Sequence, residues 1–392
     1  MRKMLKYSLI ALMGLTAAEA GVTVNDGVAI YTADAQAKAQ SSVDFSEAIP
    51  MKKTLPAALM DADALTSSFR DQGSKALPKG SAEAGKMGSG NTKLQTTVPL
   101  TRVRPDIEVQ EYGDAVDGIT IPYTTSRVDM YLNINKTAFS KKYPYRAAGQ
   151  LFFKENGSSY ICSASMIKRG VLVTAGHCVV DNSTGNFYNS FQYIPSRKKK
   201  SAPYGIWEGA KVYVLNSYRY NQSGECINGV ICKNDVAVIV LKPKDGKYAG
   251  DYTGWFGYGI NTYSYAKVQG LLGAQITQLG YPASHDQATM MQRTDSLGIK
   301  AGSDYKNNTV IGSRMTGGSS GGPWLVNFGQ VAKLSSGTTR GHEAKTNVIV
   351  GVTSWGFTSD QYKIQGASQF TKGNIKKLVN AACKDEPDAC RR

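Results

Sequence analysis

Short apolar or alternating runs, separated by Gly, Asn, Ser and Tyr turns, fill the chain from Tyr143 to about residue 371. Many short runs with few helical stretches indicate an all-β fold, either a sandwich or a barrel. The exception is Lys372 to Cys383, where the apolar residues follow a helical period. The clearest strand-like runs are Gly149–Lys154, Tyr160–Ile167, Val171–Thr174, Lys211–Leu215, Asp235–Leu241, Gln275–Leu279, Val348–Ser354 and Ala367–Phe370. The apolar face of the helix would consist of Ile375, Leu378, Val379 and Ala382.

The first twenty residues have the pattern of an export signal. Basic residues precede an apolar run, Tyr7 to Ala17, that is too short to cross a bilayer, and Ala18-Glu19-Ala20 fits the small-residue rule for cleavage. We therefore expect a signal peptide over residues 1–20, cut after Ala20, and a secreted protein that is extracellular or periplasmic. Later apolar stretches are too short for a transmembrane helix.

The segment that follows the expected signal peptide differs in its sequence pattern from the rest of the chain. Its first part lacks sustained periodicity, and Ser74–Ser81 and Gly85–Gly90 are typical of flexible linkers. Near its end it becomes strand-like, as in Val128–Ile134. We therefore expect residues 21–142 to be a propeptide, largely flexible and strand-like near its end, and residues 143–392 to form the folded domain.

Basic residues near the end of this segment are candidate processing sites. Arg127 stands before an apolar run, and Lys141 and Lys142 follow further along the chain. These sites place the N-terminus of the processed protein between about residues 127 and 147.

The six cysteines occur in close pairs along the chain. Exported proteins commonly form disulfides, and the pairing of sequence neighbours is the simplest for a chain of this size. A zinc site is the weaker alternative, because the chain has only three histidines and lacks zinc-finger spacing. We expect no metal, no cofactor, and the disulfides Cys162–Cys178, Cys226–Cys232 and Cys383–Cys390.

Basic residues dominate the charge. The formal net charge is +16, although charged residues make up only 19% of the chain. Such a surface favours weak binding to polyanions, including nucleic acid and anionic membranes. The densest basic run is Arg197–Lys200, for which a solvated loop is the simpler interpretation. A basic polymer-binding protein is therefore one alternative function.

Glycines surround a pair of serines between Thr316 and Trp324. A serine hydroxyl is a weak nucleophile at neutral pH, and it needs a base, a group that orients this base, and backbone N–H donors for the oxyanion. Glycines permit the tight backbone that aims two N–H groups at one point. Glycine and serine clusters are also common in turns and linkers, so this run needs a partner base elsewhere in the chain.

A candidate base follows the apolar strand Val171–Thr174. Ala175 and Gly176 form a small-residue turn before His177 and Cys178. A bond from Cys178 to an earlier cysteine would clamp this turn to the preceding strand. An isolated histidine is more often structural, but Ala-Gly-His-Cys together with a downstream Gly-x-Ser-Gly-Gly-Pro is a two-part match that chance rarely produces.

These motifs resemble those of the chymotrypsin-fold (trypsin-like) serine proteases, and above all their secreted bacterial and fungal branch, which is similar to glutamyl endopeptidases. The resemblance covers residues 143–383 and includes Asn234–Val238, Gly280–Pro282 and Ser354–Gly356. The chain order His, Asp, Ser also matches this family. The resemblance implies two six-stranded antiparallel β-barrels with a C-terminal helix. It also implies a secreted, monomeric serine endopeptidase, made as a zymogen, that hydrolyses proteins or peptides.

Carried over by motif, His177 would be the general base and then the general acid, and Ser320 the nucleophile. Asp235 would orient the base, and the N–H groups of Gly318 and Ser320 would form the oxyanion hole. Ser319 is a rival hydroxyl, but the position within Gly-x-Ser-Gly-Gly-Pro selects Ser320. Other aspartates lie in polar, turn-like surroundings, where they cap or are solvated: Asp181, Asp245 and Asp251.

The resemblance also suggests residues that bind substrate. Ser354, Trp355 and Gly356 would pair antiparallel with the P1–P3 residues of the substrate, although an ordinary strand end with a core tryptophan is the alternative. Arg314 and Thr316 would line the primary pocket. An arginine there would favour acidic or neutral P1 side chains over Lys and Arg, but Arg314 pointing into solvent is an equal alternative.

Ser319 stands where trypsin-like enzymes usually carry an aspartate, which receives the new N-terminal ammonium on activation. A buried ammonium would have no charged partner here. We therefore expect an activation that does not use this salt bridge. A second alternative function, a catalytically silent homologue that acts as a secreted binding module, is disfavoured because His177, Asp235, Gly318 and Ser320 are all present.

Overall fold

The computed structural model describes residues 21–33, 45–51, 53–55, 62–74, 80–100, 121–129, 138–268, 270–329, 345–357 and 363–391. The predicted signal peptide, residues 1–20, lies outside the described residues, as does most of the predicted strand Val128–Ile134. Among the helices of the described part, none has the length and apolar character needed to span a membrane.

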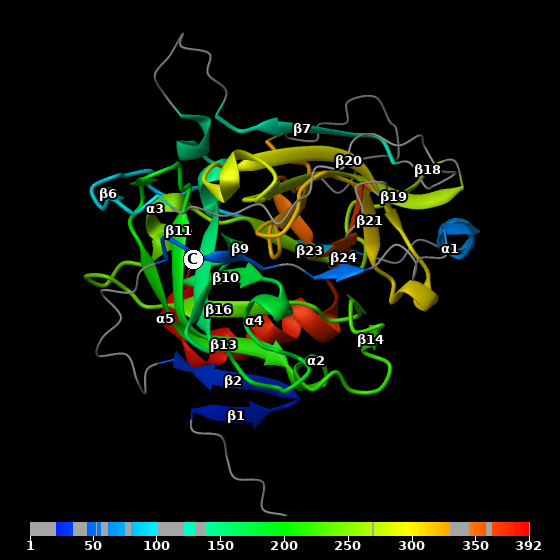
Figure 1. Ribbon diagram of the computed structural model, residues 1–392, viewed down its shortest axis with the longest axis horizontal. Coiled ribbons are helices and arrows are strands. Elements are labelled where there is room, and N and C mark those ends of the chain that lie inside the picture. The colour runs from blue at the N-terminus through cyan, green and yellow to red at the C-terminus, as the bar shows by residue number, and fades with distance from the viewer. Residues whose placement is uncertain are drawn as a thin grey trace, which may run out of the picture.

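Two closed antiparallel barrels form the body of the protein (Figure 1). The first barrel closes because β13 pairs with both β11 and β16, and the second because β22 pairs with both β19 and β23. The six strands of the first are β8 (Ala148–Glu155), β9 (Ser158–Met166), β10 (Val171–Thr174), β11 (Asn189–Pro195), β13 (Trp207–Leu215) and β16 (Ala237–Leu241). The six of the second are β19 (Leu271–Gly280), β20 (Gln292–Lys300), β21 (Thr309–Gly312), β22 (Pro323–Val326), β23 (Val348–Phe357) and β24 (Ile364–Gln369).

This architecture confirms the predicted all-β fold with two six-stranded barrels. Each predicted strand overlaps a strand of one barrel, and β10 has the predicted bounds. Strands β10 and β16 are buried along their whole length, which explains why they appear in the sequence as continuous apolar runs. They pair antiparallel with each other, so the residues that follow β10 and those that precede β16 lie at the same end of the pair.

The predicted C-terminal helix is present as two joined pieces. A π-helical turn, Lys372–Lys376, leads directly into α4 (Lys377–Asp385), and Thr371 caps the start by accepting a hydrogen bond from the Asn374 N–H at 3.1 Å. The helix packs on β13 and β16 of the first barrel. The predicted apolar face is buried: Ile375, Leu378, Val379 and Ala382.

Short elements connect and extend the barrels. They are β12 (Ser201–Ala202), α2 (Asn216–Arg219), β14 (Cys226–Ile227), β15 (Ile231–Cys232), α3 (Ala249–Thr253), β17 (Gly257–Ile260), β18 (Ala266–Val268) and α5 (Pro387–Cys390). The structure forms three disulfides: Cys162–Cys178, which joins β9 to the turn that carries His177, Cys226–Cys232 between β14 and β15, and Cys383–Cys390 between α4 and α5.

The N-terminal segment adds strands to both barrels. A hairpin of β1 (Val22–Asn25) and β2 (Val28–Thr32) extends the first barrel at β13, and Figure 1 shows it in blue at the foot of the molecule. Further strands lie on β9, β23, β17, β12 and β20; these are, in order, β3 (Ile49–Pro50), β4 (Thr54–Leu55), β5 (Ser81–Glu83), β6 (Thr96–Thr97) and β7 (Tyr123–Arg127). Helix α1 (Ala62–Ser74) buries Leu65 and Phe69 in a cluster shared with the second barrel.

These pairings differ from the expectation of a largely flexible segment. Strands that join an existing sheet edge gain their hydrogen bonds from the partner strand, so their own sequence needs no periodic pattern. The expected linker Gly85–Gly90 also lies against the protein. Lys86 exchanges backbone hydrogen bonds with Trp255, and a Cβ on Gly88 would lie 2.2 Å from the Gly254 nitrogen. Glycine is needed there for close backbone approach.

The basic run Arg197–Lys200 is not one solvated loop. Arg197 is only 1% exposed, and its guanidinium donates to Gln150 Oε1 at 2.6 Å and to the Pro99 carbonyl at 2.9 Å. Lys198 lies 3.3 Å from Asp129, and the last two lysines are exposed. The arginine therefore anchors the N-terminal segment to the first barrel and offers no charge at the surface.

Candidate active site

His177 and Asp235 meet at the ends of two paired strands. His177 lies in the 3₁₀ turn Gly176–Cys178 that follows β10, and Asp235 precedes β16. Asp235 accepts two hydrogen bonds from His177, at 2.8 Å from the backbone N–H and at 2.8 Å from the ring Nδ1. A third comes from the Ser354 hydroxyl at 2.5 Å. With an ionised carboxylate at Nδ1, the ring proton stays on that nitrogen and leaves Nε2 without a proton.

The Asp235 carboxylate is fully buried yet charged. Burial by itself would raise the pKa of Asp235. The charges of His177 and of Lys53, with the hydrogen bonds from His177 and Ser354, outweigh burial and hold this pKa well below its ordinary value. A permanent negative charge beside the imidazole stabilises an imidazolium, which a general base needs after it accepts a proton.

The loop from Gly317 to Gly322 connects the two barrels at this point. The Ser320 carbonyl accepts from the Ser163 N–H of β9 at 2.7 Å, and the Gly321 N–H donates to the Thr353 carbonyl of β23 at 2.8 Å. Gly318 has a φ of 91°, and a Cβ there would lie 2.5 Å from the Tyr281 carbonyl oxygen. Only glycine fits this conformation without strain.

Met51 of the N-terminal segment contacts this loop. The Gly318 N–H donates to the Met51 carbonyl at 2.9 Å, and the Ser320 hydroxyl makes a long hydrogen bond of 3.4 Å to the same oxygen. His177 Nε2 is buried and has no hydrogen-bond partner within the described residues. The structure therefore joins His177 to Asp235 but engages Ser320 with Met51.

Lys53 lies beside the buried carboxylate. Its ammonium is 3.8 Å from Asp235 Oδ2, donates to the Tyr218 hydroxyl at 3.1 Å and is 3.0 Å from Cys232 Sγ. Burial lowers the pKa of Lys53, and the nearby charges of Asp235 and Glu225 oppose that shift. Sequence reasoning missed Met51 and Lys53, because their segment has no motif and no periodicity.

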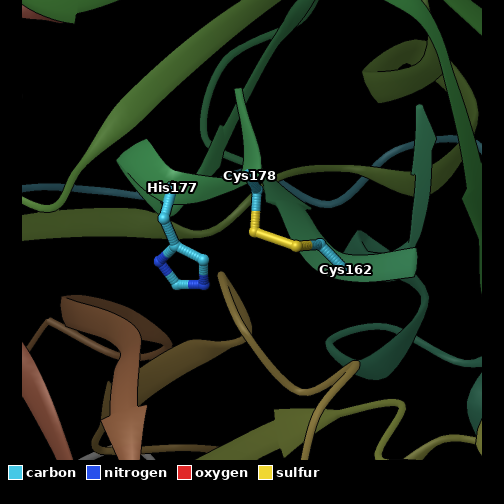
Figure 2. Close-up of side chains that lie close together, drawn as sticks. All are labelled: Cys162, His177 and Cys178. Carbon is cyan, nitrogen blue, oxygen red and sulfur yellow. A yellow bond between two sulfur atoms is a disulfide. The ribbon is translucent and has the colours of Figure 1, made fainter. Parts of the chain in front are cut away.

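Figure 2 shows the imidazole of His177 beside the disulfide that joins Cys162 and Cys178. The potential ligand atoms of these three residues lie within 4.8 Å of one another. Metal ions bind cysteine as a thiolate, and both sulfur atoms here are oxidised in the disulfide. This cluster therefore clamps the histidine turn, and it does not have the chemistry of a metal centre.

The family model "Trypsin" matches residues 135–374, more than half of the chain. The chain belongs to the trypsin family. The matched range includes both barrels and every residue of the site except those of the N-terminal segment.

Two curated relatives share this part of the chain. A glutamyl endopeptidase of Bacillus licheniformis is 26% identical over 216 residues, which are 55% of this chain and 60% of the relative. An extracellular metalloprotease of Bacillus subtilis is 25% identical over 222 residues, which are 56% of this chain and 64% of that protein. The chain thus spans less than two thirds of the length of these relatives.

A solved structure is also similar. It is a thermostable serine protease AL20 from an extremophilic microorganism, with a TM-score of 0.48 and 22% identity, and the match covers 61% of this chain and 97% of the AL20 chain.

Several sequence-predicted residues of this trypsin-family chain lie around the loop. The side chains of Ser354 and Trp355 point inward, the former to Asp235 and the latter, 2% exposed, to Asn308 Oδ1 at 2.7 Å. Only their backbone can therefore face a substrate. The Gly356 N–H donates to the Lys53 carbonyl at 3.1 Å. The tryptophan is therefore a core residue of β23, as in the alternative interpretation, and Gly356 of the same strand bonds to the N-terminal segment.

Arg314 is exposed, which agrees with the solvent-facing alternative. Its backbone carbonyl accepts from the Ser284 hydroxyl at 3.2 Å, and Thr316 Oγ1 accepts from the Ser284 N–H at 3.0 Å. Thr316 is half-buried. The guanidinium of Arg314 therefore does not form the floor of a pocket in this structure.

A network of neutral groups lies behind the serine loop. Gln365 donates to the Met315 carbonyl at 2.5 Å and lies 3.3 Å from the Ser319 hydroxyl, which itself donates to the Thr316 carbonyl at 2.7 Å. Gln278 connects Gln365 to neighbouring strands; it also bonds with Ser313 and Thr353. These residues are buried, and no short motif in the sequence indicated either glutamine. The network provides hydrogen-bond partners for the Ser319 hydroxyl, and none of these partners is a charged group.

Proposed function

We propose that the protein is a secreted serine endopeptidase that hydrolyses peptide bonds through Ser320, His177 and Asp235. The observation that carries the proposal is the fully buried Asp235, which accepts one hydrogen bond from the His177 ring and one from the His177 backbone N–H, beside the serine loop. Membership of the trypsin family supports the same chemistry. The direct test is hydrolysis of a protein substrate by the processed chain, with the Ser320→Ala chain as control.

In the proposed reaction, Ser320 Oγ attacks the carbonyl carbon of the substrate and its proton passes to His177 Nε2. The N–H groups of Gly318 and Ser320 stabilise the oxyanion, and Asp235 stabilises the imidazolium. The C–N bond then breaks as the amine takes the proton from His177, which leaves an acyl-enzyme. A water molecule repeats the sequence, restores the serine hydroxyl and releases the acid.

The N-terminal segment fits the role of a propeptide. Met51 and Lys53 stand in front of the loop and the carboxylate that the reaction needs. We propose that residues 1–20 are a signal peptide, that residues 21–142 are a propeptide, and that the active form begins between about residues 127 and 147. On this proposal the full chain is a zymogen, and removal of its propeptide exposes the site.

We expect the activation to be independent of a defined N-terminus. Ser319 is satisfied by Thr316 and Gln365, so a new ammonium group has no buried carboxylate to pair with. Full chains with an inserted site-specific cleavage sequence near residue 142 would yield enzymes with zero, one or three extra residues. Their kcat/KM values should agree within about threefold, since the extension removes no buried ion pair. A loss of about 100-fold on extension would show that a buried ammonium is required.

Specificity should follow the neutral surroundings of the serine loop. Lys or Arg at P1 needs a carboxylate in the pocket, whereas Ser313, Gln278 and Gln365 carry none. A library of peptides that vary only at P1 should give kcat/KM values for Lys and Arg no higher than for Gln. Because Arg314 is exposed, Arg314→Ser should change the P1 profile by less than about threefold. A strong preference for Lys or Arg would contradict this assignment.

A further inference from the structure

Residues on the two sides of Lys52 contact different barrels: Ile49–Met51 lie on the first and Lys53–Leu55 on the second. Strand β3 pairs parallel with β9 of the first barrel, and the Met51 N–H donates to the Ile161 carbonyl at 2.8 Å. Strand β4 pairs parallel with β23 of the second barrel, where Gly356 lies opposite Thr54. Figure 1 shows this blue segment between β9 and the β23–β24 pair. We call residues 49–55 the cleft segment.

The direction of the cleft segment is opposite to that expected of a substrate. A substrate that pairs antiparallel with β23 meets Gly356 with its P3 residue first, and its P1 carbonyl reaches Gly318 two residues later. The cleft segment meets Gly318 first, through the Met51 carbonyl, and reaches Gly356 two residues later, through the Lys53 carbonyl. The parallel pairing of β4 with β23 independently shows that the cleft segment runs opposite to an antiparallel substrate.

A reversed chain is a poor substrate even when its carbonyl oxygen accepts a hydrogen bond from an N–H group of the proposed oxyanion hole. After Met51 the chain continues toward Lys53 and β23, which is the side where a productive substrate has its acyl portion. His177 would then not face the leaving nitrogen that it must protonate. The Ser320 hydroxyl also contacts the Met51 oxygen as a hydrogen-bond donor, and His177 Nε2 has no partner among the described residues.

Lys53 provides a charged contact between the cleft segment and the candidate site. Its side chain is 10% exposed, and its ammonium lies between the Asp235 carboxylate, the Tyr218 hydroxyl and Cys232. The ring of Tyr218 also faces this ammonium, 5.0 Å from its centroid. A buried cation with a carboxylate and a hydroxyl around it has the geometry of a specific subsite and differs from a surface ion pair.

We propose that the cleft segment is a reversed, uncleaved inhibitor of the site, and that Asp235, Tyr218 and Cys232 form a lysine subsite that holds it through Lys53. This proposal rests on the proposed protease function and adds the orientation and the anchor of the inhibitory peptide. The subsite binds a primary ammonium group, and it engages the same carboxylate that orients His177.

Labelling of the full chain tests the anchor. A fluorescent fluorophosphonate reacts with an accessible catalytic serine, and a gel separates the intact from the processed chain. The intact Lys53→Met chain should react roughly 10- to 100-fold faster than the intact wild-type chain, because a buried hydrogen bond to a charged group is lost. The matched control, Lys52→Met, removes the same charge one residue away and should react at about the wild-type rate. Equal rates for Lys53→Met and wild type would overturn the subsite.

A peptide in trans tests the direction and remains informative if Lys53→Met prevents folding. A synthetic peptide of residues 46–55 should inhibit the enzyme obtained by processing of the folded full chain, and mass spectrometry should find the peptide intact. The peptide with Lys53→Met should have a Ki roughly 10- to 100-fold higher, and the one with Lys52→Met an unchanged Ki. Cleavage after Met51 would overturn the reversed direction, and equal Ki values for all three would overturn the lysine subsite.

The outcomes separate this inference from the function on which it rests. If the processed chain neither hydrolyses peptides nor reacts with the fluorophosphonate, the proposed protease function fails. Binding of the fluorescein-labelled peptide to the processed Ser320→Ala chain would still show whether the cleft segment has a binding site on the barrels. If the processed enzyme is active and this peptide does not bind it, only the inhibitory assignment fails.

Discussion

Replacement of Ser320 by alanine is expected to lower kcat by about 10⁶-fold, because loss of the nucleophile removes the acyl-enzyme route altogether. The fold should be retained. The loop is positioned through its backbone: the Ser320 carbonyl accepts from the Ser163 N–H, the Gly318 carbonyl accepts from the Ser163 hydroxyl, and the Gly321 N–H donates to the Thr353 carbonyl. Among the described residues, the hydroxyl itself makes one hydrogen bond, the 3.4 Å contact with Met51. The measurement is kcat on a peptide substrate, with the melting temperature of each variant as the test of folding.

Ser319→Ala is the matched control, because it removes the neighbouring hydroxyl from the same loop. That hydroxyl donates to the Thr316 carbonyl and lies near Gln365, so its loss should cost at most about tenfold in kcat/KM, the value of one neutral hydrogen bond. If Ser319→Ala were the dead variant and Ser320→Ala remained active, the assignment of the nucleophile would be wrong.

Asp235→Asn is expected to lower kcat by about 10⁴-fold while the protein stays folded. An asparagine can still accept from the His177 backbone N–H, but its NH₂ group would face Nδ1 and favour the tautomer with the proton on Nε2. The ring would then be unable to take the proton of Ser320. The nearby Lys53 would also lose its carboxylate partner, so intact Asp235→Asn chains should lose the segment more readily.

Asp181→Asn provides the comparison for this variant. Asp181 accepts hydrogen bonds from Ser183 and Thr184 in an exposed turn and has no contact with the imidazole. Its replacement should change kcat by less than about threefold. Near-wild-type activity in Asp235→Asn, or a loss in Asp181→Asn as large as in Asp235→Asn, would mean that a different acid orients His177.

The barrels could be predicted from the sequence because their strands obey local rules. Strand β10 is buried on both faces, so Val171–Thr174 is a continuous apolar run with a small-residue turn after it. The helix after Thr371 was predictable from its apolar face alone. In contrast, the strands of the N-terminal segment form on edges that the barrels provide, and β3 and β4 have only two residues each. A two-residue strand carries no period.

The same distinction between local pattern and tertiary contact applies to the residues of the candidate site. His177, Gly318 and Ser320 stand in motifs whose spacing reflects a strand end or a tight turn, so they could be proposed from the sequence. Lys53, Gln278 and Gln365 act through tertiary contacts with residues far away in the chain, such as Lys53 with Asp235. The sequence left two options for Arg314, because the position of a loop side chain depends on its neighbours in space. The structure places it at the surface.

Fluorophosphonate labelling of the processed chain, followed by peptide mass mapping, tests the central claim most directly. The account predicts one modified residue, Ser320, with labelling lost in Ser320→Ala and strongly slowed in His177→Ala, since the serine is activated by its base. Absence of labelling in a processed, folded chain would contradict the account. So would modification of Ser319, or labelling that does not depend on His177.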